Sequence, residues 1–383
     1  MLPTDRDVRF GADAILLTAD AVTALGASKV LLVCGGRSFE ASGAVRLLDK
    51  LDDVAEVRRW SDYAPNTDAA DLIEGLRITD EFEPDVIVGV GGGSAMDMSK
   101  LLCAYQSITD ETELHDAIRA NAPVTERSLK LVLAPTTSGS GSEATHFAVV
   151  YIGDSKNSIA GPAMLPDTVI IDPLLTLSSS TYQRATSGID AFAQATESLW
   201  SVGATDTSRA YAAEALPLLF DALPGFVNEP DADNATTMAL GSHLAGRAID
   251  VSKTTAAHAL SYGITKGYGP SHGHAVALTL GEFIAAHADA DPTRLQPGIS
   301  AAEHADAMRR VLDVLGSVDG DHARDRFRRL CEELGLEMRL SNVGVTTAEQ
   351  AHALAGKVNV ERLGNNPIRF ETDELAALVT RAM

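Results

Sequence analysis

Short apolar runs alternate with helical patterns in the first half of the chain. Runs rich in Val, Leu and Ile, each closed by Gly, Pro or Asp, lie at residues 29–34, 85–90, 129–134 and 168–171. Apolar residues with helical spacing fill the segments between them, as at residues 42–51 and 67–82. This alternation predicts an α/β domain whose sheet is mainly parallel and covered by helices.

The second half of the chain has longer helical patterns and few β-branched runs. Stretches rich in Ala and Leu lie at residues 186–202, 208–220, 235–249 and 301–315. The change of pattern predicts an all-α C-terminal domain. We therefore expect two domains, residues 1–177 and residues 178–383.

The composition agrees with a globular protein of two ordinary domains. The chain has 383 residues, of which 45% are hydrophobic and 22% are charged. No apolar run reaches the roughly 18 residues that a membrane-spanning helix needs. The first residues, MLPTDRDVRF, lack the charged-then-apolar pattern of a secretory signal. We expect a cytoplasmic protein with no membrane partner.

The cysteines and the net charge exclude further classes of protein. The three cysteines, Cys34, Cys103 and Cys331, are sparse and odd in number, which argues against a disulfide framework and fits a reducing compartment. The formal net charge of -22 disfavours nucleic-acid binding, which needs a basic surface. In so acidic a chain, an anionic substrate requires a local basic pocket.

A glycine-rich turn follows the predicted strand at residues 85–90. Gly91, Gly92, Gly93 and Ser94 come directly before a helical pattern at residues 95–105. Glycines let the backbone approach a ligand closely, and a helix N-terminus offers free N–H groups to a pyrophosphate. The alternative is a tight strand-to-helix turn that binds nothing.

A second loop, PTTSGSGSE at residues 135–143, follows the next predicted strand. Its hydroxyl side chains and glycines suit sugar hydroxyls and phosphate oxygens better than a core. Because the carboxyl ends of parallel strands meet at one edge of the sheet, both loops should lie at the same nucleotide-binding edge.

Four polar residues of the second half can form a metal site. Asp190 and Gln194 are four residues apart and share a helix face, which Glu197 continues. His258 and His272 follow later, on either side of a glycine-rich turn. One carboxylate, one amide oxygen and two imidazoles can hold Zn²⁺ or Fe²⁺ with a position open for substrate. Spacing alone favours a simpler interpretation, a buried polar helix face and two unrelated histidines.

The motifs together resemble the iron-containing (group III) alcohol dehydrogenases, in the superfamily that also holds glycerol dehydrogenases and dehydroquinate synthases. Residues 91–100, GGGSAMDMSK, are similar to the family's GGGSxxDxxK turn, and residues 135–143 to its PTTxGTGSE loop. Residues 172–173 and 366–369 are similar to its DP and C-terminal NPR segments. The resemblance covers nearly the whole chain and implies a Rossmann-like N-terminal domain and a helical C-terminal domain.

The resemblance also implies a metal bound by one Asp and three His. Asp190, His258 and His272 match three of these ligands, whereas Gln194 stands where the remaining His is expected. This departure leaves the identity and tightness of the metal open. Tyr262 stands where many members carry a further His linked to proton delivery, so the resemblance implies Tyr262 or His274 as the catalytic proton donor.

The nucleotide is expected to be NADPH or NADH. Members that prefer NAD often carry an Asp after the second strand, but this chain has Gly35 and Arg37 there, so we expect NADPH to be accepted. A solvated surface position for Arg37 is the alternative. The full set of expected nucleotide-binding residues is Gly35, Arg37, Asn66, Gly91, Gly92, Gly93, Ser94, Asp97, Thr136, Thr137, Ser140 and Lys156.

The residues before His258 suggest an anionic substrate. Arg247, Lys253 and Thr254, with Ser142 of the second loop, are the expected substrate-binding residues. A solvated helix face is the alternative. With Gln194, this stretch is similar to the branch of the family that interconverts phosphonoacetaldehyde and 2-hydroxyethylphosphonate.

We therefore expect a metal-assisted, NAD(P)H-dependent aldehyde reductase with a small anionic substrate, in a homodimer. Three further possibilities are an enzyme of the same fold for another small alcohol or diol, a cyclising lyase like dehydroquinate synthase, and a non-catalytic nucleotide-binding protein.

Overall fold

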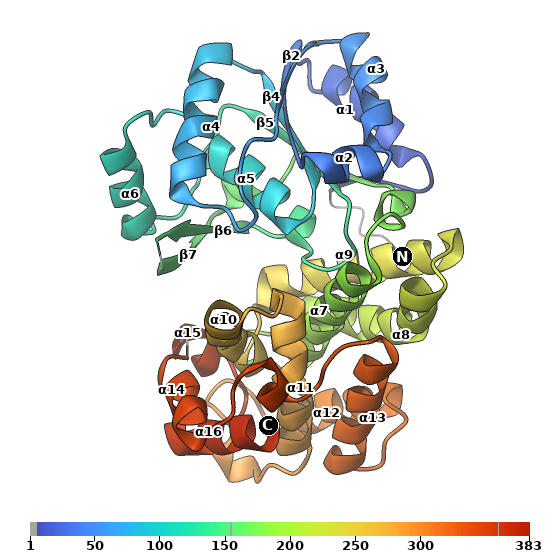
Figure 1. Cartoon of the computed structure of the whole chain (residues 1–383), viewed down its shortest axis with the longest axis vertical. Helices are drawn as coiled ribbons and strands as arrows, with labels where there is room; N and C mark the ends of the chain where they lie inside the picture. Colours follow the sequence, from blue (N-terminus) through green and yellow to red (C-terminus); the bar gives the residue numbers. More distant parts are fainter. Residues whose placement is uncertain (1–5, 154, 359) are drawn as a thin grey trace. The chain divides into compact units, whose positions relative to one another are not determined.

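The chain divides into two compact units, Met1–Ser179 and Ser180–Met383. The computed structural model describes residues 6–153, 155–358 and 360–383 (Figure 1). The expected boundary, between residues 177 and 178, falls two residues before this division.

A six-stranded parallel sheet organises the first unit. Its strand order is β1-β8-β5-β4-β2-β3, and every pairing is parallel. The strands are β1 (Asp7–Phe10), β2 (Lys29–Cys34), β3 (Glu56–Trp60), β4 (Val86–Gly91), β5 (Lys130–Pro135) and β8 (Thr168–Ile171). The parallel α/β prediction is confirmed, and the four expected strands lie within one residue of their expected positions. The sequence analysis missed β1 and β3, which are short, carry charged residues and form the two edges of the sheet.

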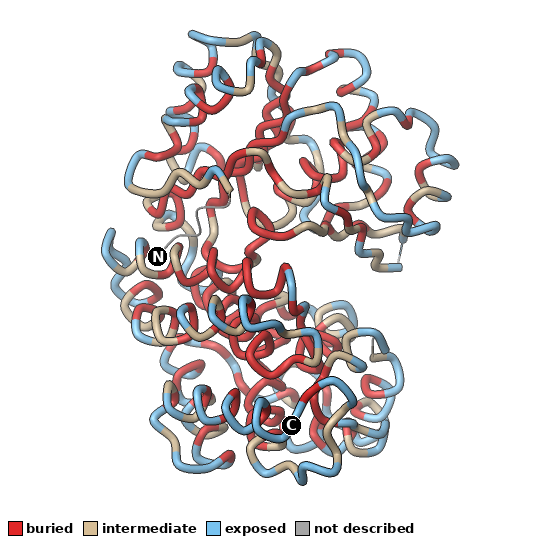
Figure 2. Tube along the Cα trace, turned by 180° about the vertical axis from the view of Figure 1, so that it is seen from behind, coloured by how far each residue is buried: buried red, intermediate tan, exposed pale blue. Residues whose placement is uncertain are grey.

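Helices cover both faces of this sheet. The helices of the unit are α1 (Thr18–Ala24), α2 (Arg37–Ala41), α3 (Leu47–Asp52), α4 (Ala69–Phe82), α5 (Gly93–Ala104) and α6 (Glu111–Ala120). One core cluster joins α1, α2 and α3 to residues such as Val30 and Val88, and the other joins α4, α5 and α6 to residues such as Leu31 and Ile87. Successive strand residues therefore serve opposite faces. Each residue of β4 is buried, and the central strands lie in the red interior of this unit (Figure 2).

A small antiparallel hairpin adds to this unit. Its strands are β6 (Phe147–Ile152) and β7 (Ser155–Ala160), which the sequence analysis did not predict. The backbone N–H of Tyr151 donates to the carbonyl of Thr67, 2.8 Å away, and joins the hairpin to the segment before α4.

Among the described residues of the second unit, every helix-or-strand element is a helix, which confirms the all-α prediction. Its helices are α7 (Thr181–Trp200), α8 (Asp206–Asn228), α9 (Ala232–Ser252), α10 (Ala256–Tyr268), α11 (His272–Ala288), α12 (Ala301–Val314), α13 (Gly320–Glu333), α14 (Ala348–Gly356), α15 (Val360–Gly364) and α16 (Thr372–Arg381). Helix α7 is central, since it packs against α8, α9, α11 and α12 and is buried on nearly all sides. Polar residues of α7 must therefore find partners on neighbouring helices.

Among the described residues, one helix is long and apolar enough to cross a membrane. This helix is α8, which also contains Pro217 and Pro224. It packs closely against α7 and α9. A single helix of this length and composition is weak evidence for a membrane span.

Candidate metal and nucleotide sites

Three polar side chains line one face of the buried helix α7. Asp190, Gln194 and Glu197 are 7%, 4% and 0% exposed, and their spacing of four and three residues stacks them along the helix. The Gln194 side chain donates from Nε2 to Oδ2 of Asp190 at 3.2 Å. The expected polar face therefore exists, and it is buried.

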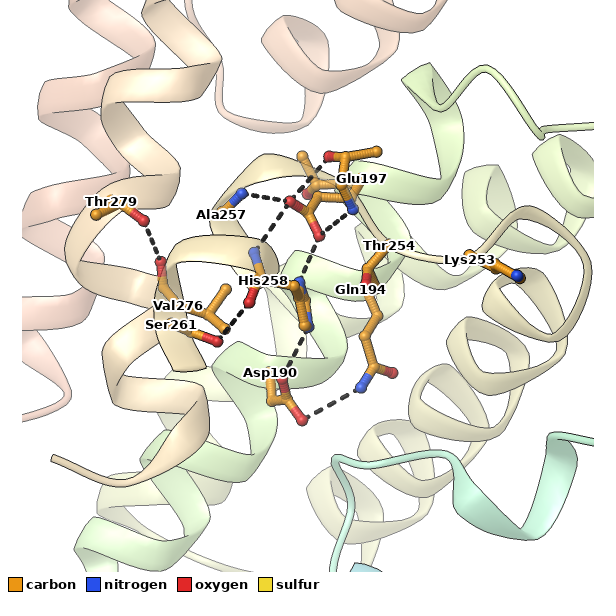
Figure 3. Close-up of polar contacts among 12 residues, drawn as sticks. Asp190, Gln194, Glu197, Lys253, Thr254, Ala257, His258, Ser261, Val276 and Thr279 are labelled. Atoms are coloured by element: carbon orange, nitrogen blue, oxygen red, sulfur yellow. Dashed lines mark hydrogen bonds and ion pairs between the residues drawn. The ribbon is translucent and has the colours of Figure 1, made fainter. Parts of the chain in front are cut away.

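Two histidines from neighbouring helices meet this face. His258 lies in the first turn of α10, and His272 is the first residue of α11. The Nε2 atoms of His258 and His272 lie 3.3 Å and 3.8 Å from Oδ1 of Asp190. One potential ligand atom from each of the three residues lies within 4.8 Å of the others. Figure 3 shows Asp190 and His258 facing each other, with Gln194 beside them.

Hydrogen bonds orient both imidazole rings. His258 Nδ1 contacts Oε2 of Glu197, and His272 Nδ1 lies 3.2 Å from Oγ of Ser261. Each ring therefore turns its other nitrogen, Nε2, toward Asp190. This arrangement is usual for metal-binding histidines, whose second nitrogen is held by a neighbouring group.

The residues present fit a divalent metal ion. Nε2 of His258 is buried and lies 3.3 Å from Oδ1 of Asp190, but it makes no hydrogen bond of good geometry among the described residues, although a buried ring nitrogen normally makes one. One carboxylate and two imidazoles form a donor set suited to Fe²⁺ or Zn²⁺. Asp190, His258 and His272 would hold the ion. Gln194 lies beside them and is the predicted fourth donor, through Oε1.

Burial and charge act in opposite directions on the Glu197–His258 pair. Burial alone would raise the pKa of the Glu197 carboxyl, but the neighbouring His258 and the hydrogen bonds from Thr255 lower it overall. Burial alone would lower the pKa of His258, but Glu197 and Asp190 outweigh this effect and raise the pKa to about 10. Without a metal, His258 is thus a cation between two carboxylates, and a metal must replace its proton.

The two expected proton donors have different surroundings. The Tyr262 ring stacks on His272, with 5.8 Å between ring centroids and 14° between planes. His274 points elsewhere: its Nδ1 lies 3.1 Å from the hydroxyl of Tyr182, and its Nε2 lies 2.6 Å from the carbonyl oxygen of Glu337. Both ring nitrogens of His274 are therefore engaged within the protein, which favours a structural role for it.

The two glycine-rich loops of the first unit lie side by side. They follow the paired strands β4 and β5, and the N–H of Thr136 donates to the carbonyl of Gly91 at 2.9 Å. A Cβ atom added to Gly93 would lie 3.2 Å from the Ser140 side chain, and one added to Gly92 would lie 3.5 Å from Thr137 Oγ1. The second loop therefore packs closely against the backbone at the start of α5, and glycine at position 93 makes this close approach possible.

Asp97 and Ser142, predicted to bind the nucleotide and the substrate, are hydrogen-bonded to each other. The Ser142 hydroxyl donates to Oδ1 of Asp97 at 2.6 Å, and the N–H of Val149 donates to Oδ2 at 2.9 Å. The buried Lys100 likewise donates to the carbonyls of Thr145 and Phe147. The Asp and Lys of the GGGSAMDMSK motif thus hold the loop around Ser142 against α5. This bonding gives Asp97 and Ser142 a structural function in the loop, which the sequence analysis did not anticipate.

The remaining expected nucleotide residues lie at or near the same edge of the sheet. The N–H of Asn66 donates to Oγ of Ser94 at 3.1 Å, and Lys156 lies on β7. Gly35 follows β2, and the exposed Arg37 is the first residue of α2.

Arg59, on the edge strand β3, was not among the residues predicted for the nucleotide site. Its Nη2 atom lies 3.4 Å from the carbonyl oxygens of both Gly35 and Gly36, and its guanidinium stacks over the Phe39 ring at 4.7 Å. Arg59 therefore holds the turn after β2 in place. Its position next to this turn follows from the pairing of β2 with β3, which the sequence pattern did not predict.

The expected substrate-binding residues of the second unit are near the metal face in sequence but are engaged elsewhere. The buried Arg247 lies over the Tyr211 ring, 5.2 Å from its centroid. Lys253 pairs with Glu361 at 2.7 Å, and Figure 3 shows its side chain pointing away from Asp190 and His258. The carbonyl oxygen of Thr254 accepts a hydrogen bond from Asn365 at 3.0 Å.

Two family models match almost the whole chain. The model described as "Iron-containing alcohol dehydrogenase" matches residues 5–173, and "Fe-containing alcohol dehydrogenase family, C-terminal" matches residues 184–383.

Individual relatives are similar over most of their length. A phosphonoacetaldehyde reductase from Streptomyces viridochromogenes is 30% identical over 310 residues, which cover 77% of this chain and 75% of the relative. A sulfoacetaldehyde reductase from Bilophila wadsworthia is 28% identical over 96% of this chain and 91% of the relative. A crystal structure of sulfoacetaldehyde reductase from Bifidobacterium kashiwanohense in complex with NAD⁺ superimposes with a TM-score of 0.88, at 28% identity, and covers 100% of this chain and 99% of that chain.

Proposed function

We propose that this chain, which belongs to the iron-containing alcohol dehydrogenase family, reduces a small aldehyde that carries an anionic group. The chain is an oxidoreductase of this family, with a nicotinamide nucleotide and a divalent metal as its cofactors. The first candidate reaction is phosphonoacetaldehyde to 2-hydroxyethylphosphonate. The observation that carries this choice is the similarity to a phosphonoacetaldehyde reductase over three quarters of both chains.

The chemistry follows from the residues around Asp190. When bound, the metal polarises the carbonyl group as a Lewis acid, and the reduced nucleotide supplies a hydride. Asp190, His258 and His272 would hold the ion within the helical unit. Tyr262, stacked on His272, is the better placed of the two expected proton donors, because both nitrogens of His274 have protein partners.

The anionic group of the substrate needs a cation, and Lys253 can provide it. The protein loses little stability when Lys253 leaves its ion pair with Glu361. Its ion pair with Glu361 joins side chains that are 46% and 70% exposed. Exposed pairs of this kind contribute only about 0–1 kcal/mol, so Lys253 can exchange Glu361 for a phosphonate. Thr254 and Arg247 remain further candidates for this contact.

Sulfoacetaldehyde is the second candidate substrate. The similarity to two sulfoacetaldehyde reductases, one of them with a TM-score of 0.88, supports it. A sulfonate is tetrahedral like a phosphonate but has only one negative charge near neutral pH. Relative rates with the two aldehydes should therefore report on the number of cations at the anion site.

NADPH is the nucleotide that we expect the enzyme to accept. The turn after β2 has Arg37 exposed at the start of α2. Guanidinium groups suit a 2′-phosphate. We further propose that the enzyme is a cytoplasmic homodimer, which size-exclusion chromatography with light scattering would test.

A substrate panel tests the proposed reaction. Protein loaded with Fe²⁺ or Zn²⁺ is assayed with phosphonoacetaldehyde, sulfoacetaldehyde and butyraldehyde, each with NADPH and NADH. We expect the highest kcat/KM for phosphonoacetaldehyde. Equal or higher values for butyraldehyde would overturn the anionic-substrate proposal and favour an enzyme for another small alcohol or diol.

The same assay distinguishes the reductase from a cyclising lyase and from a protein without activity. A lyase like dehydroquinate synthase regenerates its nucleotide, so net NAD(P)H consumption with an aldehyde excludes it. A nucleotide-binding protein without activity would show the same background rate as Asp190→Ala, in which a ligand of the proposed metal is missing.

A further inference from the structure

Glu197 is a fully buried carboxylate with five hydrogen-bond donors around it. Its Oε1 atom accepts from Thr255 Oγ1 and the Ala257 N–H, each at 2.9 Å, and from the His258 N–H at 3.4 Å. Its Oε2 atom accepts from the Thr255 N–H at 3.1 Å and from His258 Nδ1. Figure 3 shows the Glu197 carboxylate beside Ala257 and His258. Every one of the five donors belongs to the segment that begins α10.

The carboxylate replaces a local cap at the N-terminus of α10. Thr255, the N-cap residue, makes no side-chain hydrogen bond to the N–H groups of its own helix. The first turn of a helix has free N–H groups and a partial positive charge, which a carboxylate stabilises. Here the carboxylate comes from α7, so one group both caps α10 and ties it to the helix that carries Asp190.

The same carboxylate determines which nitrogen of His258 keeps its proton when the ring gives up the other one, as metal binding requires. Because Oε2 accepts from Nδ1, the neutral ring has its lone pair on Nε2, the atom 3.3 Å from Asp190 Oδ1. We propose that Glu197 is a positioning residue that fixes the tautomer and orientation of His258 and thereby sets the affinity of the site for a divalent metal. This inference rests on the metal site of the proposed function and does not depend on the substrate.

A purely structural cap would have different consequences. Loss of a cap lowers stability but leaves the preference of His258 for one tautomer unchanged. Glu197→Gln keeps the size but has only one acceptor oxygen. With that oxygen on the three donors that Oε1 serves, its NH₂ group faces Nδ1 and can satisfy it only when the proton moves to Nε2. That tautomer blocks the nitrogen that must bind the metal.

Thr255→Val is the matched control. It removes the Oγ1 donor to Glu197 and the acceptor for Trp200 Nε1, which lies 3.0 Å away, without altering either neighbour of the His258 ring. It should therefore destabilise α10 while leaving Nδ1 of His258 bound to Glu197.

Titration of the metal-free full-length proteins with Co²⁺, followed by its visible absorption, measures the affinity directly. We expect Glu197→Gln to raise the Kd for Co²⁺ by roughly 10–100-fold, as for other groups that hold metal-binding histidines. Thr255→Val should raise the Kd for Co²⁺ less than about threefold, even if its Tm falls as far as the Tm of Glu197→Gln. Unchanged affinity in Glu197→Gln, or an equal loss in both variants, would overturn the positioning role.

Two further measurements separate the possible failures. If the unmodified protein does not bind Co²⁺, the metal site of the proposed function fails together with this inference. If Glu197→Gln does not fold, Glu197→Asp keeps the charge at α10 but withdraws the carboxylate from Nδ1, and its Kd should rise at least about tenfold. Wild-type affinity in Glu197→Asp would overturn the inference.

Discussion

The side-chain amide of Gln194 donates a hydrogen bond to the carboxylate of Asp190, with 3.2 Å between Nε2 and Oδ2. Because Nε2 faces the carboxylate, Oε1 is the Gln194 atom that can bind a metal ion. An amide oxygen suits Fe²⁺ or Zn²⁺ less well than imidazole. The structure brings one Asp and two His together as strong donors, and Gln194 stays the predicted fourth donor.

Gln194→His should tighten metal binding. The substitution adds an imidazole one helical turn after Asp190, and we expect the Kd for Zn²⁺ to fall by at least about tenfold. Competition with a chromophoric chelator measures this change. Asp190→Asn is the control, since it should weaken binding in both backgrounds. Equal Kd values with Gln and His at position 194 would mean that this position does not face the ion.

Lys253 has a strained backbone that glycine should relieve. Its φ of 57° and ψ of 177° lie in a region that side chains rarely adopt. The side-chain amide of Asn365 holds it there, since Nδ2 donates to the carbonyls of Ser252 and Thr254, on either side of Lys253. We expect the free energy of unfolding of Lys253→Gly to be about 1 kcal/mol higher than that of Lys253→Ala. Urea titration of both variants measures this difference.

Catalysis should respond differently from stability in these two variants. Both lack the ammonium group, so both should raise the KM for the anionic aldehyde by at least about tenfold if Lys253 binds it. Glu361→Gln removes the partner of Lys253 and should leave this KM unchanged or lower. Wild-type KM in Lys253→Ala would remove Lys253 from the substrate site.

Arg37 and Arg59 should affect nucleotide binding in different ways. Arg37 is exposed at the start of α2, and its replacement by Ala should raise the KM for NADPH about tenfold while leaving that for NADH unchanged. Arg59 contacts the carbonyls of Gly35 and Gly36, so Arg59→Ala should impair both nucleotides through the turn. Steady-state kinetics with both nucleotides measure this. Equal effects of Arg37→Ala on NADPH and NADH would contradict a contact with the 2′-phosphate.

Much of the fold could be predicted because its central elements have strong hydrophobic patterns. The buried strands β2, β4, β5 and β8 are continuous apolar runs, and α7, α8, α9 and α12 have helical spacing. The edge strands β1 and β3 have no such pattern, since each has solvent on one side and includes charged residues. The β6–β7 hairpin was also missed.

The site could be predicted only in part, because its function depends on contacts between distant elements. The spacing of Asp190 and Gln194 predicts that they share a helix face. The resemblance to the family identifies His258 and His272 as further ligands. The importance of Glu197 depends on the packing of α10 against α7, which brings five donors to one carboxylate. No spacing in the sequence indicates that contact.

The helical unit also contains a buried histidine pair that should make its stability depend on pH. His287 and His304 lie 5.9 Å apart between ring centroids, and Asn366 Nδ2 lies 3.1 Å from Nε2 of His287. Burial, and to a smaller extent the neighbouring His304, lower the pKa of His287 well below 6.5, and burial lowers the pKa of His304. Trp200 and Phe370 contact the His287 ring as well, so no carboxylate among these neighbours can stabilise a charge.

The sign of the pH effect follows from proton binding. As the pH falls through 6.5, the unfolded chain takes up more protons at these two positions than the folded chain, because burial lowers both pKa values in the folded protein. Their contribution to stability is therefore complete above pH 6.5 and is lost as the pH falls, with a slope of up to about 1.4 kcal/mol per pH unit for each histidine.

His287→Gln should flatten this dependence, because it removes one of the two titrating groups. Between pH 6 and pH 5 we expect the slope of the unfolding free energy to decrease by about 1 kcal/mol per pH unit. The chain has two tryptophans, Trp60 and Trp200, so a Trp60→Phe background lets Trp200 fluorescence report on the helical unit alone during urea unfolding. The exposed His322 provides the control, since His322→Gln should keep the slope of the parent protein. A slope that is the same with and without His287 would mean that this ring becomes protonated in the folded protein, despite its burial.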